Sequence, residues 1–143
     1  FLEVLKRSLL KARPELLCTG ESSPEETERF FEQFRHAGKR PDAVCCLNDI
    51  CAGDLIRDAH RRGIRLDEVQ LSGFDHASLT AFLPHELLTV EPPLEELGKC
   101  AAELLIRQIE NPGFGFIRKN LESRLISIQP TDFSERGATS CRN

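Results

Sequence analysis

The sequence has 143 residues, of which 40% are hydrophobic and 29% charged, and these proportions are typical of one globular domain. Its formal net charge is -4 and its arginine pairs are dispersed among acids, which excludes a basic surface for nucleic acid on this chain. No run approaches the ~20 apolar residues of a membrane span, and the first residues lack the pattern of a secretory signal. We therefore expect a soluble protein located in the cytoplasm.

The first predicted element is a helix that is already under way at Phe1 and ends before Arg13. Because the chain opens with Phe and not Met, we expect its natural N-terminus to lie elsewhere. A short apolar run at residues 15–19, closed by Gly20, predicts a strand.

A second helix is predicted to begin after residue 22. Ser23, Pro24 and Glu26 provide an N-cap, a first-turn proline and a capping-box acid. The helix ends at Gly38. Its apolar face carries three phenylalanines: Phe30, Phe31 and Phe34.

The segment from Pro41 to His76 predicts a β-α-β unit with a right-handed crossover. The continuous apolar run at 43–47 is typical of a central strand covered on both faces. Asp49 is predicted to cap the following helix, and the second strand, at 69–72, stops at the turn 73–76. The helix has an apolar stripe at helical spacing: Ala52, Leu55, Ile56 and Ala59.

Four more elements are predicted after this unit. They are a single turn at 79–83, a strand at 87–90, a helix at 93–110 and a strand at 124–128. The long helix has a broad apolar side: Leu94, Leu97, Ala101, Leu104, Leu105 and Ile109.

The sequence contains six cysteines: Cys18, Cys45, Cys46, Cys51, Cys100 and Cys141. They show neither a Cys-x-x-Cys pair nor the paired spacing of a zinc site, so we expect no bound metal. The first four sit inside or beside apolar patterns, where a thiol behaves as a small hydrophobe. A redox or disulfide role is the alternative, and a reducing compartment fits the hydrophobe reading best.

Ligands of open α/β sheets bind beyond the carboxyl ends of the strands, where loops and helix N-termini converge. This rule selects the turn at 19–23, the pair Asn48-Asp49 and the turn at 73–76. Asn48 offers a donor and an acceptor, and the Asp75 carboxylate can accept from adjacent hydroxyls or an amine. The pair suits a polyol, sugar or nucleoside, although both residues could simply be solvated turn residues.

An enzyme would need Asp75 with His76 or His85 as a base, and Ser72 or Cys46 as a nucleophile. Adjacent residues on an extended chain point to opposite sides, and Ser72 lacks a nucleophile elbow. We therefore expect neither catalysis nor a cofactor. Three histidines are expected to be exposed polar residues: His36, His60 and His76.

Several motifs together resemble the C-terminal half of the effector domain of the LacI/GalR family. They are Pro41-Asp42-Ala43-Val44, Asn48-Asp49, Ala52-Gly53, Gly63-Ile64-Arg65-Leu66, Ser72-Gly73-Phe74-Asp75, Leu97-Gly98 and Arg136-Gly137-Ala138-Thr139. The resemblance covers nearly the whole chain. It implies part of a type I periplasmic-binding-protein-like fold, an α/β three-layer sandwich with a parallel sheet.

The resemblance also implies a division into subdomains. Residues 1–91 and 130–143 would form the C-terminal subdomain, and 92–129 a segment of the N-terminal one. The rest of that subdomain and a helix-turn-helix DNA-binding domain would lie outside this chain. The apolar face of the helix at 94–109 would then lose its packing partner, so exposure, swapping or disorder is expected.

By position, Asn48 and Asp75 match the family's strand-end ligand contacts, and Ser22 lies near a place often held by a sugar-stacking aromatic. Pro92 stands where a ligand-contacting Gln is common, and His76 replaces a second Asp. The helix at 50–62 and the turn after His76 match dimerisation surfaces, which implies a homodimer.

The resemblance implies a transcriptional repressor that senses a small-molecule effector and binds operator DNA through the absent domain. The alternative is a solute-binding protein of a transport system on the same fold. An α/β enzyme domain ranks last.

Overall fold

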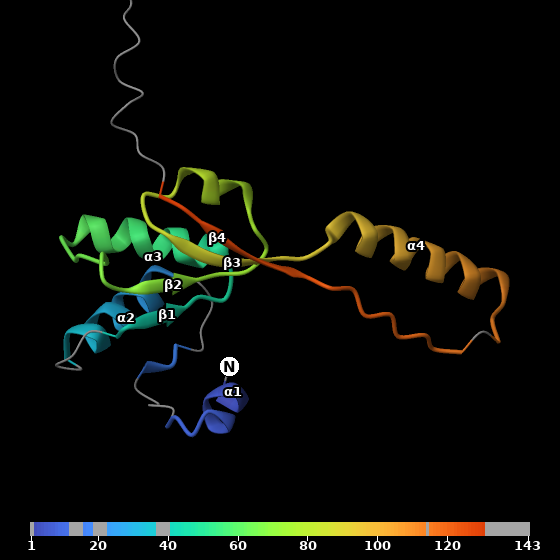
Figure 1. Cartoon of the computed structure of the whole chain (residues 1–143), viewed down its shortest axis with the longest axis horizontal. Coiled ribbons are helices and arrows are strands. Elements are labelled where there is room, and N and C mark those ends of the chain that lie inside the picture. Colours follow the sequence, from blue (N-terminus) through green and yellow to red (C-terminus); the bar gives the residue numbers. More distant parts are fainter. Residues whose placement is uncertain (1, 12–15, 19–22, 37–40, 114, 131–143) are drawn as a thin grey trace, which may run out of the picture.

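The computed structural model describes residues 2–11, 16–18, 23–36, 41–113 and 115–130 (Figure 1). Its elements are α1 (Leu2–Arg7), α2 (Pro24–His36), β1 (Ala43–Cys45), α3 (Asp49–Arg61), β2 (Gln70–Ser72), the 3-10 helix η2 (Ser78–Phe82), β3 (Leu87–Glu91), α4 (Leu94–Glu110) and β4 (Arg124–Ile128). None of the helices in these ranges combines the length and apolar character that crossing a membrane requires.

The strands form one sheet in the order β1-β2-β3-β4. Neighbours β1, β2 and β3 run parallel, with Val44 paired with Leu71 and Ser72 with Leu88. Strand β4 is antiparallel to β3 along its whole length. The predicted β-α-β unit and the α/β class are therefore confirmed.

Helix α3 supplies much of the hydrophobic core, and its predicted stripe is confirmed. Ala52, Leu55, Ile56 and Ala59 are all buried, and they pack in one cluster with strand residues such as Leu71 and Leu87. The same cluster contains Phe31 of α2, which is fully buried and makes an edge-on contact with Phe30, the ring centroids being 5.5 Å apart.

Arg62, at the end of α3, connects this helix with α2. Its guanidinium pairs with Glu28 and lies over the Phe31 ring, 5.3 Å from the centroid. Both partners are on α2, so one arginine joins the two helices through an ion pair and a cation-π contact.

The prediction of a central strand at 43–47 is wrong for the described part of the chain. Strand β1 has three residues and lies at the edge of the sheet, and Leu47 beyond it is 81% exposed. Residues 16–18 of the strand predicted at 15–19 form no strand, and the remainder lies outside the described residues. The apolar run indicates a strand that needs covering, but no described segment covers its outer edge.

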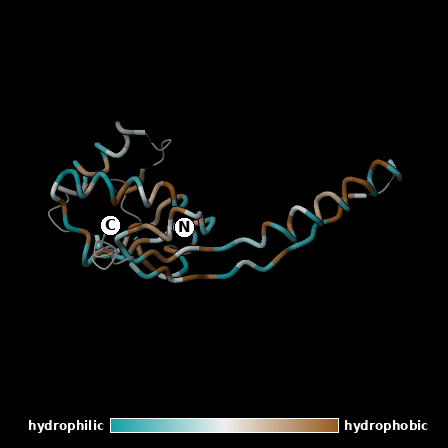
Figure 2. Tube along the Cα trace, turned by 90° about the horizontal axis from the view of Figure 1, so that it is seen from above, coloured by the Kyte–Doolittle hydropathy of each residue, from teal (hydrophilic) through white to brown (hydrophobic). Residues whose placement is uncertain are grey.

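Beyond β3 the chain leaves the sheet as an extended arm, residues 92–123, made of α4 and the segment that returns beside it (Figures 1 and 2). Cys100 is the one buried residue among the described side chains of α4. The expected exposure of the apolar face is confirmed, because four of its residues are more than half exposed: Leu94, Leu97, Leu105 and Ile109.

After the arm, strand β4 returns to the same sheet. Residues 124–128 pair with β3 in the sheet that also contains β1 and β2. Five consecutive residue pairs, from Leu87 with Ile128 to Glu91 with Arg124, hold them there.

The cysteines only partly behave as predicted. Cys18 and Cys45 are exposed, whereas Cys46 and Cys51 are partly buried and Cys100 is buried. Burial raises the pKa of the Cys46 thiol to about 12, and the neighbouring Cys51 and Cys45 add to the rise. Cys46 thus remains a protonated, unreactive thiol near neutral pH.

Candidate functional site

The carboxyl ends of β1, β2 and β3 meet at one edge of the sheet, and backbone hydrogen bonds join the turns that follow them. The N–H of Asp49 donates to the carbonyl of Phe74 at 3.0 Å, and the N–H of Asp75 donates to the carbonyl of Val90 at 2.9 Å. Asn48 directly precedes Asp49, and Asp75 directly follows Phe74. The two predicted contact residues therefore lie at the same edge of the sheet.

The buried carboxylate of Asp49 ties this edge together. Its side chain has no exposed area, Oδ1 accepts from the Thr89 hydroxyl at 2.7 Å, and Oδ2 accepts from the N–H of Ala77 at 2.8 Å. Asp49 is also the first residue of α3, where the helix N-terminus stabilises negative charge. A single side chain thus links α3, the turn after β2 and strand β3.

The predicted roles of Asn48 and Asp49 are partly exchanged. Asn48 is the N-cap of α3, with an extended backbone and its Oδ1 accepting from the N–H of Cys51 at 2.9 Å. The prediction that Asp49 is the cap is wrong. Both residue types cap helices well, so the choice depended on where the first helical turn begins.

Gly73 allows the buried carboxylate to lie directly beneath the turn. A Cβ at this position would be 2.2 Å from Oδ1 of Asp49 and 3.1 Å from its Cα. No side chain fits there without displacing α3 or the turn. The sequence marks Gly73 only as a turn residue, because the close approach depends on packing between segments distant in the chain.

Asp75 and His76 have left-handed backbones, with φ of 94° and 49°. Asp and His tolerate this region better than most residues, and here the surrounding hydrogen bonds hold them in it. Asp75 is exposed, so its carboxylate is available at the surface of the sheet edge.

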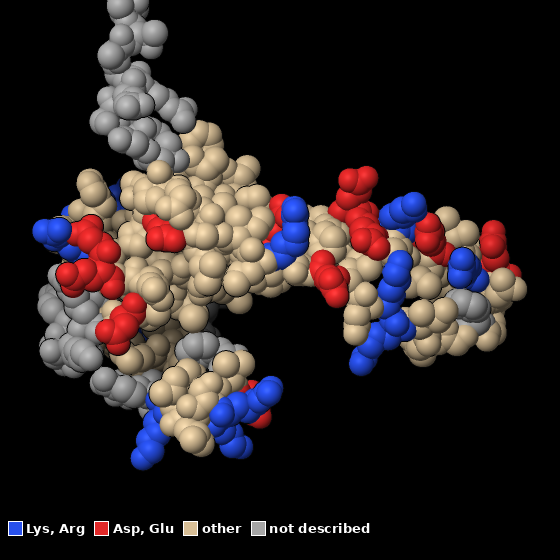
Figure 3. Space-filling model, in the orientation of Figure 1, with Lys and Arg blue, Asp and Glu red and all other residues tan. Residues whose placement is uncertain are grey.

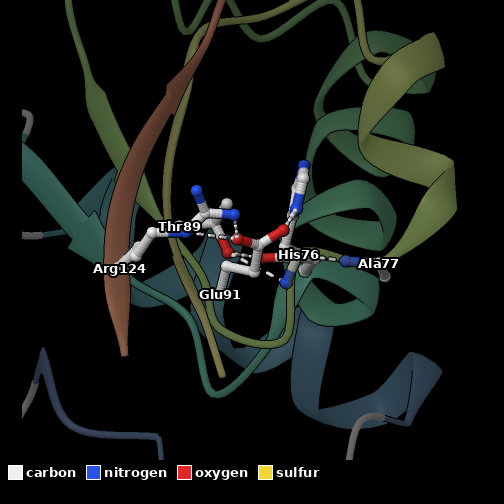
Figure 4. Close-up of polar contacts among 6 residues, drawn as sticks. His76, Ala77, Thr89, Glu91 and Arg124 are labelled. Carbon is white, nitrogen blue, oxygen red and sulfur yellow. Dashed lines mark hydrogen bonds and ion pairs between the residues drawn. The ribbon is translucent and has the colours of Figure 1, made fainter. Parts of the chain in front are cut away.

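His76 is half-buried and not the exposed polar residue that was predicted. Its Nδ1 donates to Oε1 of Glu91 at 2.8 Å, and Arg124 donates through Nε to Oε2 of the same carboxylate at 2.8 Å (Figure 4). The hydrogen bond from His76 and then that from Arg124 lower the pKa of Glu91. The three side chains fix the edge where β3 leaves the sheet.

A hollow of about 680 Å³ opens between this edge and the base of the arm. Asp75, His76 and Glu91 line one side of it, and Pro92 and the start of α4 line another. Acidic and basic side chains are interspersed along the arm (Figure 3). Most residues that line the hollow have ionisable side chains, among them Asp75, Lys99 and Arg124, so its walls offer many hydrogen-bonding groups to a ligand.

The predicted site residues differ in how directly they face the hollow. Asp75 lines the hollow, as does Pro92. Asn48 lies at the same edge of the sheet, with its oxygen engaged in the helix cap. Ser22 lies outside the described residues. The described part of the chain contains no group of three or more His, Cys, Asp or Glu side chains arranged to hold a metal ion.

Residues 1–127 match the model of the periplasmic binding protein-like domain, and the chain belongs to this family. Within it, the chain is similar to LacI-family repressors. It is 31% identical to the HTH-type transcriptional repressor PurR of Erwinia tasmaniensis over 137 residues, 95% of this chain and 38% of that protein. It is 27% identical to the repressor CytR of Escherichia coli over 127 residues, 88% of this chain and 37% of that protein.

Solved structures of LacI-type regulators are also similar to this chain. A LacI-type transcription regulator from Bifidobacterium animalis superposes with a TM-score of 0.67 at 26% identity, over 90% of this chain and 46% of that one. A putative LacI regulator from Bacillus cereus has a TM-score of 0.74 at 19% identity, over 91% and 46%. The resemblance to LacI-type regulators is confirmed, and the chain spans less than half the length of each of these proteins.

Proposed function

We propose that this chain is the effector-sensing and dimerisation part of a LacI-type transcriptional regulator that acts in the cytoplasm. A helix-turn-helix domain elsewhere in the protein would bind operator DNA, and ligand binding here would modulate it. The family membership and the similarity to proteins named as repressors support this function.

The observation that carries the proposal is the position of Asp75 at the edge of the hollow. Its side chain is exposed just beyond the carboxyl end of β2 and lines the hollow. The backbone around it is held by two hydrogen bonds, one from the N–H of Ala77 to the Asp49 carboxylate and one from the N–H of Asp75 to the carbonyl of Val90. A carboxylate on a backbone fixed in this way can accept two hydrogen bonds from neighbouring hydroxyls. We therefore favour a sugar, a polyol or a nucleoside-like ligand, with Asn48 and Ser22 as further contacts.

Ligand binding would act through the two subdomains. We propose that residues 1–91, together with the tail after residue 130, form one, and that the arm belongs to the other, with β4 crossing back into the first sheet. A ligand in the hollow would touch both the sheet edge and the base of α4. It would thereby favour one relative arrangement of the subdomains and shift the population of DNA-binding dimers.

Calorimetric titration of the chain with ribose, cellobiose, glycerol and adenosine tests the site. Asp75→Asn is expected to weaken the binding of a ligand at least about tenfold, because a charged acceptor is lost. Asp67→Asn is the matched control, since Asp67 is exposed and lies at the other end of β2. Equal affinity in the parent and Asp75→Asn would refute the proposed contact, and binding of none of the four would refute the ligand class.

The dimer would use the outer side of α3 and the helix η2. Ile50 and Phe82 are 54% and 62% exposed, and η2 packs onto α3 beside Gly53, where a Cβ would lie 3.1 Å from Leu79. Two exposed apolar residues on adjoining elements suit a second copy of the chain. Phe82→Asp is expected to halve the mass measured by light scattering, and an unchanged dimer would contradict this surface.

A solute-binding protein of a transport system is the second candidate, and the family description, periplasmic binding protein-like, favours it. The gene sequence preceding Phe1 distinguishes the two. A helix-turn-helix segment is expected there for a regulator, whereas a secretory signal would establish the transport reading instead.

A further inference from the structure

The arm contains a close contact between a sulfur and an amine. The Nζ of Lys119 lies 2.9 Å from the Sγ of Cys100, although 19 positions separate the two residues. Cys100 is 8% exposed, whereas 52% of the Lys119 side chain is exposed. The contact joins α4 to the segment that returns beside it.

The amine of Lys119 interacts with both the sulfur and a carboxylate. The hydrogen bond to Cys100, followed by the charge of Cys100, raises the pKa of Lys119. Glu96 lies 3.9 Å from the same Nζ. Cysteine sulfur is a side-chain atom that oxidants attack readily, and here an amine lies in contact with it.

We propose that Cys100 and Lys119 form a redox-modification site, at which dioxygen joins the two side chains through one oxygen atom as an S–O–N bridge. The separation of sulfur and nitrogen leaves room for a single bridging atom with little movement. Together the pair carries three exchangeable hydrogens. One stays on nitrogen, two leave as water with the second oxygen atom, and the four electrons that sulfur and nitrogen lose reduce dioxygen.

The bridge would close a loop between α4 and the returning segment. Leu104 and Leu105 of α4 line a small hollow together with Phe116 and Ile117 of that segment. Helix α4 ends at Glu110, and a turn at residues 112–113 follows it. A covalent link between Cys100 and Lys119 would keep α4 and the returning segment together even when their noncovalent contacts break. The oxidised arm is therefore expected to resist proteolysis more than the reduced arm.

The test is the intact mass of the chain after incubation in air, compared with a sample kept under argon with a thiol reductant. The bridge adds one oxygen and removes two hydrogens, an increase of about 14 Da that the reductant reverses. Tryptic mapping is expected to show the Cys100 and Lys119 peptides joined, with no cleavage after Lys119.

Lys119→Arg keeps the positive charge but removes the reacting amine, so the increase is expected to disappear. Cys45→Ser is the matched control, because Cys45 is exposed in the sheet, and the increase is expected to remain. No increase in the parent, or an increase that persists in Lys119→Arg, overturns the proposal. A gain of about 16 or about 32 Da, as for sulfenic or sulfinic acid, or a loss of about 2 Da, as for a direct S–N bond, overturns it as well.

Discussion

Helices α3 and α4 have the same kind of apolar stripe in opposite surroundings. The stripe of α3 is buried against the sheet, whereas Leu94, Leu97 and Leu105 of α4 are more than half exposed on the arm. Helical spacing predicts that a helix forms and which side is apolar. It carries no information on what covers that side, and in α4 the partner is not among the described residues.

Truncating one leucine in each helix should give the largest difference in stability loss between the two regions. Leu55 of α3 is 7% exposed, and Leu55→Ala is expected to lower the free energy of unfolding by about 2–5 kcal/mol. Leu105 of α4 is 59% exposed, and Leu105→Ala is expected to change it by no more than about 0.5 kcal/mol. Urea denaturation measures both. Similar losses would mean that α4 is packed in solution.

Glycines in the two regions should respond in opposite directions. Gly73→Ala places a methyl group 2.2 Å from the Asp49 carboxylate and is expected to destabilise the chain by about 1–3 kcal/mol. Gly98 in α4 has no atom within 4 Å of a built Cβ, so Gly98→Ala should favour the helix by about 0.5–1 kcal/mol. Thermal unfolding followed by circular dichroism compares the variants, and a tolerated Gly73→Ala would contradict the close approach.

Removing the Thr89 hydroxyl tests the buried carboxylate. Thr89→Val keeps the shape of the side chain but removes the donor to Oδ1 of Asp49, and both residues are fully buried. A loss of about 1–3 kcal/mol is expected. Ser127→Ala removes an exposed hydroxyl that donates to Glu86 and should have little effect. If the two variants unfold alike, the link from α3 to β3 contributes nothing.

The smallest effect is expected at Glu91, where the sheet meets the arm. Hydrogen bonds from His76 and Arg124 lower the pKa of Glu91. The ionised carboxylate therefore stabilises the fold at pH values above its ordinary pKa of 4.5, and this contribution is lost as the pH falls and Glu91 is protonated. The gap in melting temperature between the parent and Glu91→Gln should therefore shrink from about pH 7 to about pH 3. A gap that widens in acid would reverse the assigned sign. Glu68→Gln, with an exposed side chain at the other end of β2, serves as the control.

Local patterns predicted α3 well because everything they need is local. The stripe at Ala52, Leu55, Ile56 and Ala59 follows helical spacing, and a polar cap precedes it. The same holds for β3, β4 and η2, which punctuating prolines and short apolar runs predict.

The hydrogen bonds of the candidate site could not be read locally. Asp49 is bound to Thr89, forty positions away, and to Ala77, so its burial depends on how three segments assemble. Position at the strand ends was enough to select Asn48 and Asp75 as candidates. It could not reveal that His76 is bound to Glu91, fifteen positions further on.

The strand β1 shows the opposite limit. Its apolar run predicted a strand in the centre of the sheet, yet among the described strands it lies at the edge. A hydrophobic run records what a segment requires, and not whether the neighbouring segment is there to supply it.

The antiparallel pairing of β3 with β4 makes the arm a removable insertion. Glu91 and Arg124 are register partners at the mouth of the arm, so the two ends of the excursion emerge side by side. A short Asn-Gly turn joining these two positions would convert β3 and β4 into an ordinary hairpin and leave the four-stranded sheet intact. The shortened chain, without the arm, would allow the sheet and its polar edge to be studied without the exposed helix.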